Sequence, residues 1–344
     1  MKYSLPAELT RLIELFESHG YATRLVGGSV RDQILGKKPK DYDLATACPP
    51  NIGQNICREA KYKVIPTGID YGTITVLTRK GPVEITTLRS DVSTDGRRAN
   101  VEFGASFEED ALRRDFTINA LSQDKNGKIF DYFGGMDDIK NKLLRFVGHP
   151  ATRVQEDYLR ILRFFRFKAR LKFSSDQAAL SAIKENLPGL TKVSQERITD
   201  ELHKTFCYQQ IEDVIEEIFS IDLFQFLFPE LVLSDLKALK NFFTQTDDID
   251  QNVRSECRLA GLILIGEKAP TDKNITLLTR KMKLSAYQQK LILNFVMGFI
   301  RLEEDFKDPA AGMDFIDRLE KNEKQPDSFL KWFVPFWQSM LRVL

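Results

Sequence analysis

The chain has 344 residues, of which 42% are hydrophobic and 29% charged, and its 50 Lys and Arg nearly balance its 49 Asp and Glu. This composition excludes a disordered chain, and the net charge of +1 argues against a protein that coats nucleic acid over its whole surface. The length predicts two or three compact units. No apolar run approaches the ~18 residues of a membrane span, and the charged, amphipathic start does not resemble a signal peptide.

The cysteine and histidine content indicates a reduced compartment. The four cysteines lie far apart with no CxxC pair, and the chain has three histidines. This pattern predicts neither a disulfide framework nor a structural zinc site. We therefore expect a cytoplasmic protein with no membrane contact and no obligate protein partner.

The first 150 residues mix strand and helix patterns, which predicts an α+β domain. In chain order we expect a strand at 21–26, a tight turn at 27–29, a short helix closed by Gly36, a strand through 38–46, two strands within 63–89 joined by a turn at 80–82, a flexible loop at 91–100, and a helix at about 107–122.

After Pro150 strand patterns nearly vanish, and helical periodicity dominates to the C-terminus. The expected helices span 153–172, 176–186, 194–218, 221–245, 251–266, 271–283, 285–304, 310–320 and 327–344. The break near residue 150 predicts an α+β head followed by an all-helical region.

Three acids in the head are candidate metal ligands. Asp41 and Asp43 are two residues apart on an expected strand, so their carboxylates share one face. Two adjacent carboxylates suit Mg²⁺, the usual cation in phosphate chemistry. Glu84, in the expected strand VEITT, is a candidate third acid. The residues alone leave open that all three are solvated surface acids.

A glycine turn precedes these acids. Gly27, Gly28 and Ser29 join a strand to a helix N-terminus, where backbone amides and the helix dipole favour a phosphate. Arg31, in the first helical turn, can add a charge-assisted bond. The alternative is a turn that needs glycine only for its backbone conformation.

The segment EEDALRRDFTINAL packs cations, an acid and an amide closely together. Asp115 and Asn119 are four residues apart and would share a helix face, with Arg114 beside them. Such a face could hold a triphosphate and a ribose hydroxyl together. A salt-bridged, solvent-exposed face is the alternative.

Residues 142–172 carry nine Lys and Arg against two acids, a local basic track that the net charge hides. The expected helix places Asp157, Arg160, Arg163 and Arg166 opposite its apolar stripe. Arginine outnumbers lysine there, which favours planar, bidentate recognition over simple solubility.

These motifs together resemble the class II tRNA nucleotidyltransferases, or CCA-adding enzymes, and their bacterial poly(A) polymerase relatives. The resemblance covers roughly residues 20–200 and rests on LVGGSVRD, KDYDLAT, RRDFTINAL, DYFGGMDD, EDYLRILRFFRF and VSQERITDEL in this order.

The resemblance implies a nucleotidyltransferase head of the polymerase-β type at 1–150, a helical neck that recognises the base at 151–215, and a helical body and tail that bind tRNA at 216–344. It implies a transferase that uses CTP, ATP and Mg²⁺ and releases pyrophosphate. Asp41 and Asp43 would bind two Mg²⁺ ions for two-metal phosphoryl transfer, and Glu84 would complete the acidic cluster. The implied nucleotide contacts are Gly28, Ser29, Arg31, Arg114, Asp115, Asn119, Asp157, Arg160, Arg163 and Arg166.

In this family the Asp and Arg of the EDxxR motif, here Asp157 and Arg160, form a template for the incoming base. Cytosine and adenine both present an amino donor beside a ring-nitrogen acceptor, which suits a carboxylate beside a guanidinium. Uracil and guanine reverse this order and would leave buried polar groups unpaired.

Four activities within the family remain open: complete CCA addition, CC addition, A addition and poly(A) synthesis. The segment PTGIDYGTITV resembles the tRNA-specific enzymes. The loop SDVSTDGRRANVEFG retains Asp95, Gly96 and Arg97, which favours A addition after CC, although Arg98-Ala99 replaces the usual His-Pro. CCA addition is therefore the leading hypothesis.

Two further readings belong to other classes. A catalytically idle RNA-binding protein would not need the intact acids and glycine turn. A transferase acting on a small molecule or protein would not need the basic track.

Overall fold

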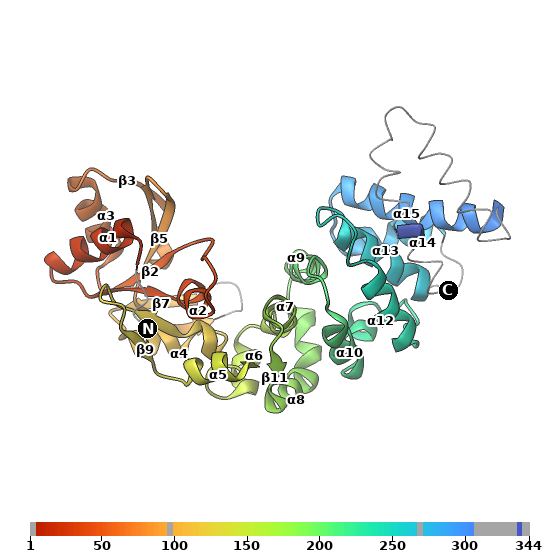
Figure 1. The fold of residues 1–344 in the computed structure, drawn as a ribbon, viewed down its shortest axis with the longest axis horizontal. Helices are drawn as coiled ribbons and strands as arrows, with labels where there is room; N and C mark the ends of the chain where they lie inside the picture. Colours follow the sequence, from red (N-terminus) through yellow and green to blue (C-terminus); the bar gives the residue numbers. More distant parts are fainter. Residues whose placement is uncertain (1–4, 95–98, 267–270, 306–335, 339–344) are drawn as a thin grey trace. The chain divides into compact units, whose positions relative to one another are not determined.

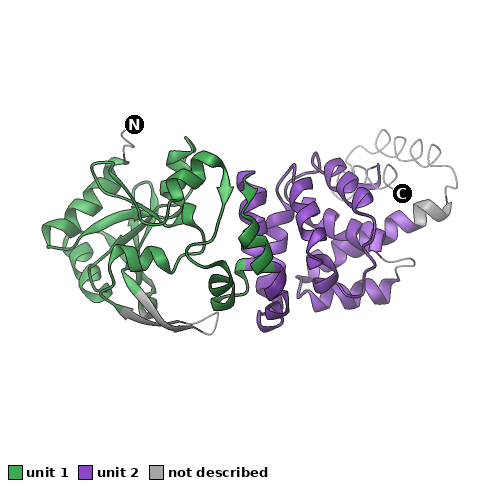
Figure 2. Ribbon diagram, turned by 90° about the horizontal axis from the view of Figure 1, so that it is seen from below, with its two compact units in different colours: residues 1–160, 173–183 green, residues 161–172, 184–344 purple. Residues whose placement is uncertain are grey.

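The computed structural model describes residues 5–94, 99–266, 271–305 and 336–338 (Figure 1). It forms two compact units, which Figure 2 distinguishes. Unit 1 comprises residues 1–160 and 173–183, and unit 2 comprises residues 161–172 and 184–344. Unit 1 contains the β-sheet, and the described elements of unit 2 are helical. The expected α+β class is confirmed.

Unit 1 is built on a seven-stranded sheet with the order β3-β4-β5-β2-β1-β8-β9. The pair β2–β5 is parallel and the other neighbouring pairs are antiparallel. The strands are β1 (Thr23–Val26), β2 (Asp43–Thr46), β3 (Lys63–Gly68), β4 (Thr73–Thr78), β5 (Gly81–Thr87), β8 (Leu121–Gln123) and β9 (Ile129–Asp131).

Unit 1 contains further elements outside this sheet. They are α1 (Ala7–Ser18), α2 (Gly28–Ile34), α3 (Pro50–Glu59), the hairpin β6 (Arg89–Thr94) and β7 (Ala99–Phe103), α4 (Phe107–Leu112), α5 (Gly135–Asn141), α6 (Pro150–Glu156), the short pair β10 (Leu143–Leu144) and β11 (Ser174–Ser175), and two 3₁₀ turns at Ile69–Tyr71 and Thr117–Asn119. Helix α8 (Gln177–Asn186) begins in unit 1 and ends in unit 2.

The strand register shows which side chains lie on each face of the sheet. Leu44, Ile85 and Ile74 are direct partners on neighbouring strands, and all three are buried. A methyl group at Gly53 of α3 would contact both Phe16 of α1 and Ile74, so α1 and α3 cover this face. Because successive side chains alternate, Asp43 and Glu84 belong to the opposite face.

The predicted helix at 107–122 is wrong beyond its first turns. Helix α4 begins at a capping box, in which Ser106 and Glu109 each accept the other's backbone amide, but it ends at Leu112. Beyond it, the Thr117 amide bonds the Arg145 carbonyl and the Val147 amide bonds the Asp115 carbonyl. These long-range bonds replace the helical ones, and local periodicity does not reveal them.

Two further expectations for unit 1 need correction. Asp41 lies in a bend before β2, so it does not share the strand with Asp43. The predicted loop at 91–100 is partly extended, because β6 continues to Thr94 and β7 begins at Ala99. The two strands of this hairpin pair antiparallel, with a shift in register between Asp91 and Ser93, and polar composition alone does not disclose this pairing.

Most described helices of unit 2 are shorter than their periodicity predicts, whereas α15 has the expected length of 20 residues. The described helices are α7 (Arg160–Leu171), a 3₁₀ segment at Leu187–Lys192, α9 (Gln195–Phe206), α10 (Glu212–Ser220), α11 (Leu223–Leu227), α12 (Leu236–Gln245), α13 (Arg254–Gly266), α14 (Asp272–Lys281) and α15 (Ala286–Asp305). The expected helices at 194–218 and 221–245 are each divided in two. The helix expected at 310–320 lies outside the described residues, as does that at 327–344 apart from helical residues 336–338.

The single helix predicted over 153–172 is interrupted within the EDxxR motif. Asp157 is extended, with φ −151° and ψ 103°, and it separates α6 from α7. Its carboxylate accepts the Leu159 amide at 3.1 Å and its carbonyl accepts the Arg160 amide at 2.9 Å. Asp157 thus restarts the helix at Arg160, as short acidic side chains do at helix starts.

Candidate active site

The site is assembled at one end of β1, where three sequence motifs meet. Val26 pairs with Asp43 on one side and with Ser122 on the other, and Asp43 pairs with Glu84 across the parallel ladder. Gly27 follows Val26 directly, and its amide donates to the Leu121 carbonyl at 3.0 Å. The glycine turn, the acids and the end of the RRDFTINAL segment therefore become neighbours.

The predicted acids gather in this region. Asp43 and Glu84 are direct partners and therefore point to the same face, and all three acids are exposed. The pKa of Asp43 is raised above its ordinary value of 3.8, because surrounding protein displaces water and because Glu84 and Asp41 add negative charge. The Arg114 charge opposes this shift. The carboxylates of the site thus repel one another, and a bound cation would reduce this repulsion.

In the part of the chain that the structure describes, no group of three or more His, Cys, Asp or Glu side chains is placed to hold a metal ion. Mg²⁺ usually takes one or two protein carboxylates and completes its octahedron with water and substrate phosphates. The carboxylates are hard oxygen donors, so their chemistry fits this ion.

The predicted glycine turn adopts a backbone that requires glycine. Gly27 has φ +72° and ψ −136°, and a Cβ there would lie 2.8 Å from Nη1 of Arg114. The first turn of α2 presents the backbone amides of Gly28 and Ser29, which can bind an anion. The Ser29 hydroxyl is buried and donates to the Val26 carbonyl at 2.9 Å, so it braces the turn.

Arg31 lies in the protein interior, with 1% of its surface exposed. Its Nε and Nη2 donate to Oδ1 of Asp32 at 2.9 and 2.8 Å, and its Nη1 donates to Oδ1 of Asn119. The guanidinium also lies beneath the turn, because a Cβ on Gly28 would come within 3.2 Å of Nη2. A direct bond from Arg31 to phosphate stays a prediction.

The RRDFTINAL residues contact one another although the expected helix is absent. The Asn119 side-chain amide donates to Oδ1 of Asp115 at 3.0 Å, and both residues are buried. Arg114 extends Nη1 towards the Gly27 turn and the Asn119 carbonyl. The structure therefore brings Arg114 and Asn119 to the same turn.

Asp157 and Arg160, the pair predicted to select the base, lie at the junction of α6 and α7. Arg160 donates through Nη1 to Oε2 of Glu156 at 2.6 Å and to the Arg153 carbonyl at 2.8 Å, and through Nη2 to the Arg113 carbonyl at 3.0 Å. These bonds link the EDxxR motif to the RRDFTINAL segment within unit 1.

Five predicted residues remain. Arg163 and Arg166 belong to unit 2, where Nε of Arg166 lies 2.6 Å from Oε2 of Glu201. Asp95, Gly96 and Arg97 lie outside the described residues. Their roles stay predictions.

Two acids of the site were not singled out by sequence reasoning. Asp32 pairs with the buried Arg31, and Asp110, which is 3% exposed, accepts both Arg113 and Arg114. Asp110 precedes these arginines by three and four residues, a spacing typical of ion pairs on a helix. That spacing was the available signal.

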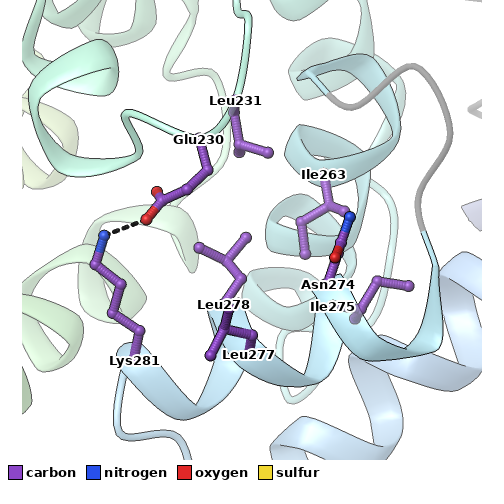
Figure 3. A pocket seen from close by; sticks show the side chains of 8 residues that line it. All are labelled: Glu230, Leu231, Ile263, Asn274, Ile275, Leu277, Leu278 and Lys281. Carbon is purple, nitrogen blue, oxygen red and sulfur yellow. Dashed lines mark hydrogen bonds and ion pairs between the residues drawn. The ribbon is translucent and has the colours of Figure 1, made fainter.

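Unit 2 contains an apolar pocket of about 210 Å³, shown in Figure 3. It lies beside α14, and an ion pair between Glu230 and Lys281 is at its edge. Its lining residues are Glu230, Leu231, Ile263, Asn274, Ile275, Leu277, Leu278 and Lys281. With a single carboxylate, already paired with a lysine, this pocket does not offer the metal chemistry of the acids in unit 1.

Two known protein families match successive parts of the chain. The poly(A) polymerase head domain matches residues 23–145, and the probable RNA and SrmB-binding site of polymerase A matches residues 172–233. The chain belongs to the family of class II tRNA nucleotidyltransferases and poly(A) polymerases. The first match contains the acids, the glycine turn and the RRDFTINAL segment.

Similar members of this nucleotidyltransferase family include the human mitochondrial CCA tRNA nucleotidyltransferase 1, which is 44% identical over 62% of this chain and 50% of its own length. The CCA-adding enzyme of Streptococcus gordonii is 39% identical over 71% of this chain and 61% of its own. The chain thus matches about half to three-fifths of the length of these curated relatives.

Solved family structures share the fold. The Bacillus stearothermophilus CCA-adding enzyme in complex with CTP has a TM-score of 0.70 at 26% identity, covering 97% of this chain and 82% of its own. The Thermotoga maritima CCA-adding enzyme complexed with tRNA has a TM-score of 0.72 at 18% identity, covering 98% and 79% respectively. In the described ranges of the present chain, no helix is long and apolar enough to cross a membrane.

Proposed function

We propose that this protein adds C, C and A to the 3′ end of tRNA from CTP and ATP, with release of pyrophosphate. The observation that carries the proposal is the register of three strands, which brings the Asp43–Glu84 pair beside the Gly27 turn. The relatives named above are CCA-adding enzymes, which supports this choice among the family's activities. A cytoplasmic location completes the proposal.

Asp41 and Asp43 would hold Mg²⁺, and Glu84 would complete the negative site. The pKa of Asp43 is raised first by burial and then by repulsion from Glu84 and Asp41, and a bound cation would relieve this repulsion. When bound, Mg²⁺ supplies the charge that activates the RNA 3′-hydroxyl and offsets the charge of the departing pyrophosphate.

The chain's own residues would position the nucleotide. The amides of Gly28 and Ser29 face the triphosphate, and Arg31 and Arg114 add positive charge beside the turn. Asp115 and Asn119, which are bonded to each other, offer polar atoms to the ribose. This preorganisation would hold the α-phosphate in line with the attacking hydroxyl.

Asp157 and Arg160 would select the base. A carboxylate opposite an exocyclic amino group and a guanidinium opposite a ring nitrogen suit cytosine and adenine alike. Glu156 and the Arg113 carbonyl fix the direction of the Arg160 guanidinium, so the donor pattern is set before the base arrives. Arg163 and Arg166 would extend the basic track along α7 towards phosphates.

We assign tRNA binding to residues 216–344, following a head at 1–150 and a neck at 151–215. From Lys273 to Arg301 the sequence contains six Lys and Arg and no acid, although the whole chain has a net charge of +1. Arg280, Lys283, Tyr287 and Lys290 are exposed around the end of α14 and the start of α15. We call these four residues the α14–α15 surface. Cations with an exposed aromatic ring suit RNA phosphates and bases.

The test is extension of three tRNA transcripts that end before CCA, after the first C and after the second C. Each receives Mg²⁺ with labelled CTP or ATP alone, and then with both nucleotides. Addition of C, C and a single A to the shortest transcript supports the proposal.

Other products would replace the proposal with a neighbouring activity. An arrest after two Cs, or extension of the CC-ended transcript alone by one A, identifies a partial enzyme. Long A tails identify a poly(A) polymerase. Binding of tRNA without incorporation identifies an RNA-binding protein that has lost catalysis.

A further inference from the structure

Asp110 is a buried carboxylate shared by two arginines of the site. Its Oδ1 accepts Nε and Nη2 of Arg113 at 2.9 and 2.5 Å, and its Oδ2 accepts Nη2 and Nε of Arg114 at 2.9 and 3.3 Å. Burial acts to raise the pKa of Asp110, but the charges of Arg114 and Arg113 outweigh it and lower the pKa. The carboxylate is therefore ionised at neutral pH.

These bonds decide which edge of Arg114 faces the active site. Two of its three guanidinium nitrogens are directed at Asp110, and the third, Nη1, lies against the Gly27 turn. Close packing at Gly27 leaves no room for a side chain between the turn and this nitrogen. Asp110 thus aims one defined part of Arg114 at the turn expected to hold the triphosphate.

A second consequence concerns the acids. Arg114 is close enough for its charge to act on the pKa of Asp43. An arginine beside exposed carboxylates without a metal would be attracted to them and form an ion pair. Asp110 competes for the same guanidinium from a buried position, where charge-assisted bonds are less weakened by water.

The same carboxylate also fixes the neighbouring residue. Arg113 is held through its side chain by Asp110, and its backbone carbonyl accepts Nη2 of Arg160. The segment that directs Arg114 to the turn therefore also provides the acceptor that orients the base-selecting arginine.

We propose that Asp110 is a positioning residue that holds Arg114 at the phosphate turn and away from the metal-binding carboxylates. The inference rests on the proposed nucleotidyltransferase function and deepens it. Asp110 contacts no reacting group and acts through Arg114.

The test compares Asp110→Asn, Arg114→Ala and the double variant in the full chain. Asp110→Asn keeps the shape and removes the charge, so Arg114 is released towards Asp43 and Glu84. We expect the Kd for CTP, measured by equilibrium dialysis without acceptor RNA, to rise about tenfold, a typical coupling between contacting residues. Binding of Mn²⁺, followed by electron paramagnetic resonance without nucleotide, should weaken as well.

Two further variants test whether Asp110 acts by positioning Arg114 or only by stabilising the fold. In the Arg114→Ala background, Asp110→Asn should change the Kd for CTP less than twofold, and Mn²⁺ binding should return to the wild-type level. Asp247→Asn is the matched control, because it removes a carboxylate that receives the buried Arg258 in unit 2. It should lower thermal stability without changing either binding constant.

The proposal is overturned if Asp110→Asn leaves both constants unchanged, or if its effect on CTP binding persists in full without Arg114. These readings do not require nucleotide transfer. A wild-type protein that binds CTP and Mn²⁺ but extends no tRNA would contradict the proposed function, while the role of Asp110 in CTP and Mn²⁺ binding would still be decided by the variants.

Discussion

At the scale of single residues, the site combines groups that are unfavourable for the folded state with groups that stabilise it. Asp43 and Glu84 are adjacent on parallel strands and repel each other. Arg31, Asn119 and Asp115 form a buried chain of hydrogen bonds behind them. The proposed function explains why the fold retains this repulsion, because a catalytic cation would bind there; such conflicts between stability and function are common.

Asp43→Asn should abolish activity and stabilise the fold. Loss of a metal carboxylate removes several kcal/mol of transition-state stabilisation, so we expect turnover to fall roughly 1,000-fold or more. The raised pKa of Asp43 means that its ionised form disfavours the native state. The native state favours the protonated carboxyl of Asp43. The stability that this preference contributes is complete below pH 3.8 and is lost as the pH rises through the raised pKa. At pH 7 in EDTA the variant should therefore melt at a higher temperature.

Two observations check the origin of this effect. The gain in melting temperature should disappear as the pH falls below 3.8, where Asp43 is protonated in both states. Added Mg²⁺ should stabilise the wild-type protein more than the variant, because only the wild type keeps the full ligand set. A variant that melts earlier than the wild type at pH 7 in EDTA would contradict the explanation.

At the scale of secondary-structure elements, unit 2 depends on one buried arginine of α13. Arg258 has no exposed surface and donates to the carbonyls of Phe206, Tyr208 and Phe243, which end α9 and lie near the end of α12. It also bonds Asp247 at 2.6 Å. Burial lowers the pKa of Arg258 to about 10, so the side chain remains charged at neutral pH. A cation at two helix C-terminal ends donates to carbonyls of the last turns and interacts favourably with the helix dipoles.

Replacing Arg258 with Met should destabilise unit 2 by about 3 kcal/mol, because several buried carbonyls and Asp247 would lose their donor. Urea unfolding followed by circular dichroism measures the change. Lys281→Met is the control, since its ion pair with Glu230 is about half exposed and should contribute no more than about 0.5 kcal/mol. Equal effects of the two substitutions would show that the buried network is not decisive.

At the scale of the whole molecule, the two units divide the proposed work. The acids, the glycine turn, Asp157 and Arg160 all belong to unit 1. Unit 2 provides Arg163, Arg166 and the α14–α15 surface. In this proposal unit 1 provides most of the nucleotide contacts, and unit 2 provides most of the tRNA contacts.

Loss of the cations of the α14–α15 surface should weaken tRNA binding without slowing the chemistry. For Arg280→Ala with Lys283→Ala and Lys290→Ala, the slope of log K against log salt should become shallower by about two to three, because each cation that no longer neutralises a phosphate lowers the slope by about one. The KM for tRNA should rise, and kcat at saturating tRNA should stay unchanged. Filter binding over a salt series and steady-state kinetics measure these quantities.

A control triple variant removes the same number of charges elsewhere in unit 2. Lys204 and Lys240 are paired with Asp200 and Glu216, and Lys237 is exposed. Replacing these three lysines with Ala should leave the salt slope close to that of the wild type. If both triple variants behave alike, the effect reflects net charge and the α14–α15 surface has no special part.

The sequence by itself determined the fold class and most of the site's chemistry. Glycine at 27, acids at 41, 43 and 84, and the arginine-rich segments are local signals, because backbone strain and charge are properties of the residue types themselves. The antiparallel pairing around residues 80–82 and the helices of the second half also follow from local pattern.

Only the tertiary structure decided where those signals meet and where helices end. Asp43 and Glu84 are 41 positions apart in sequence and become partners through a parallel ladder that no local pattern encodes. The helix expected at 107–122 stops early because backbone hydrogen bonds with Arg145 and Val147 replace the helical ones. The helix expected at 153–172 is interrupted at Asp157, whose carboxylate accepts the Leu159 amide. For the same reason Asp110 escaped notice, since its importance lies in the direction that it gives to Arg114, and direction is a property of the folded chain.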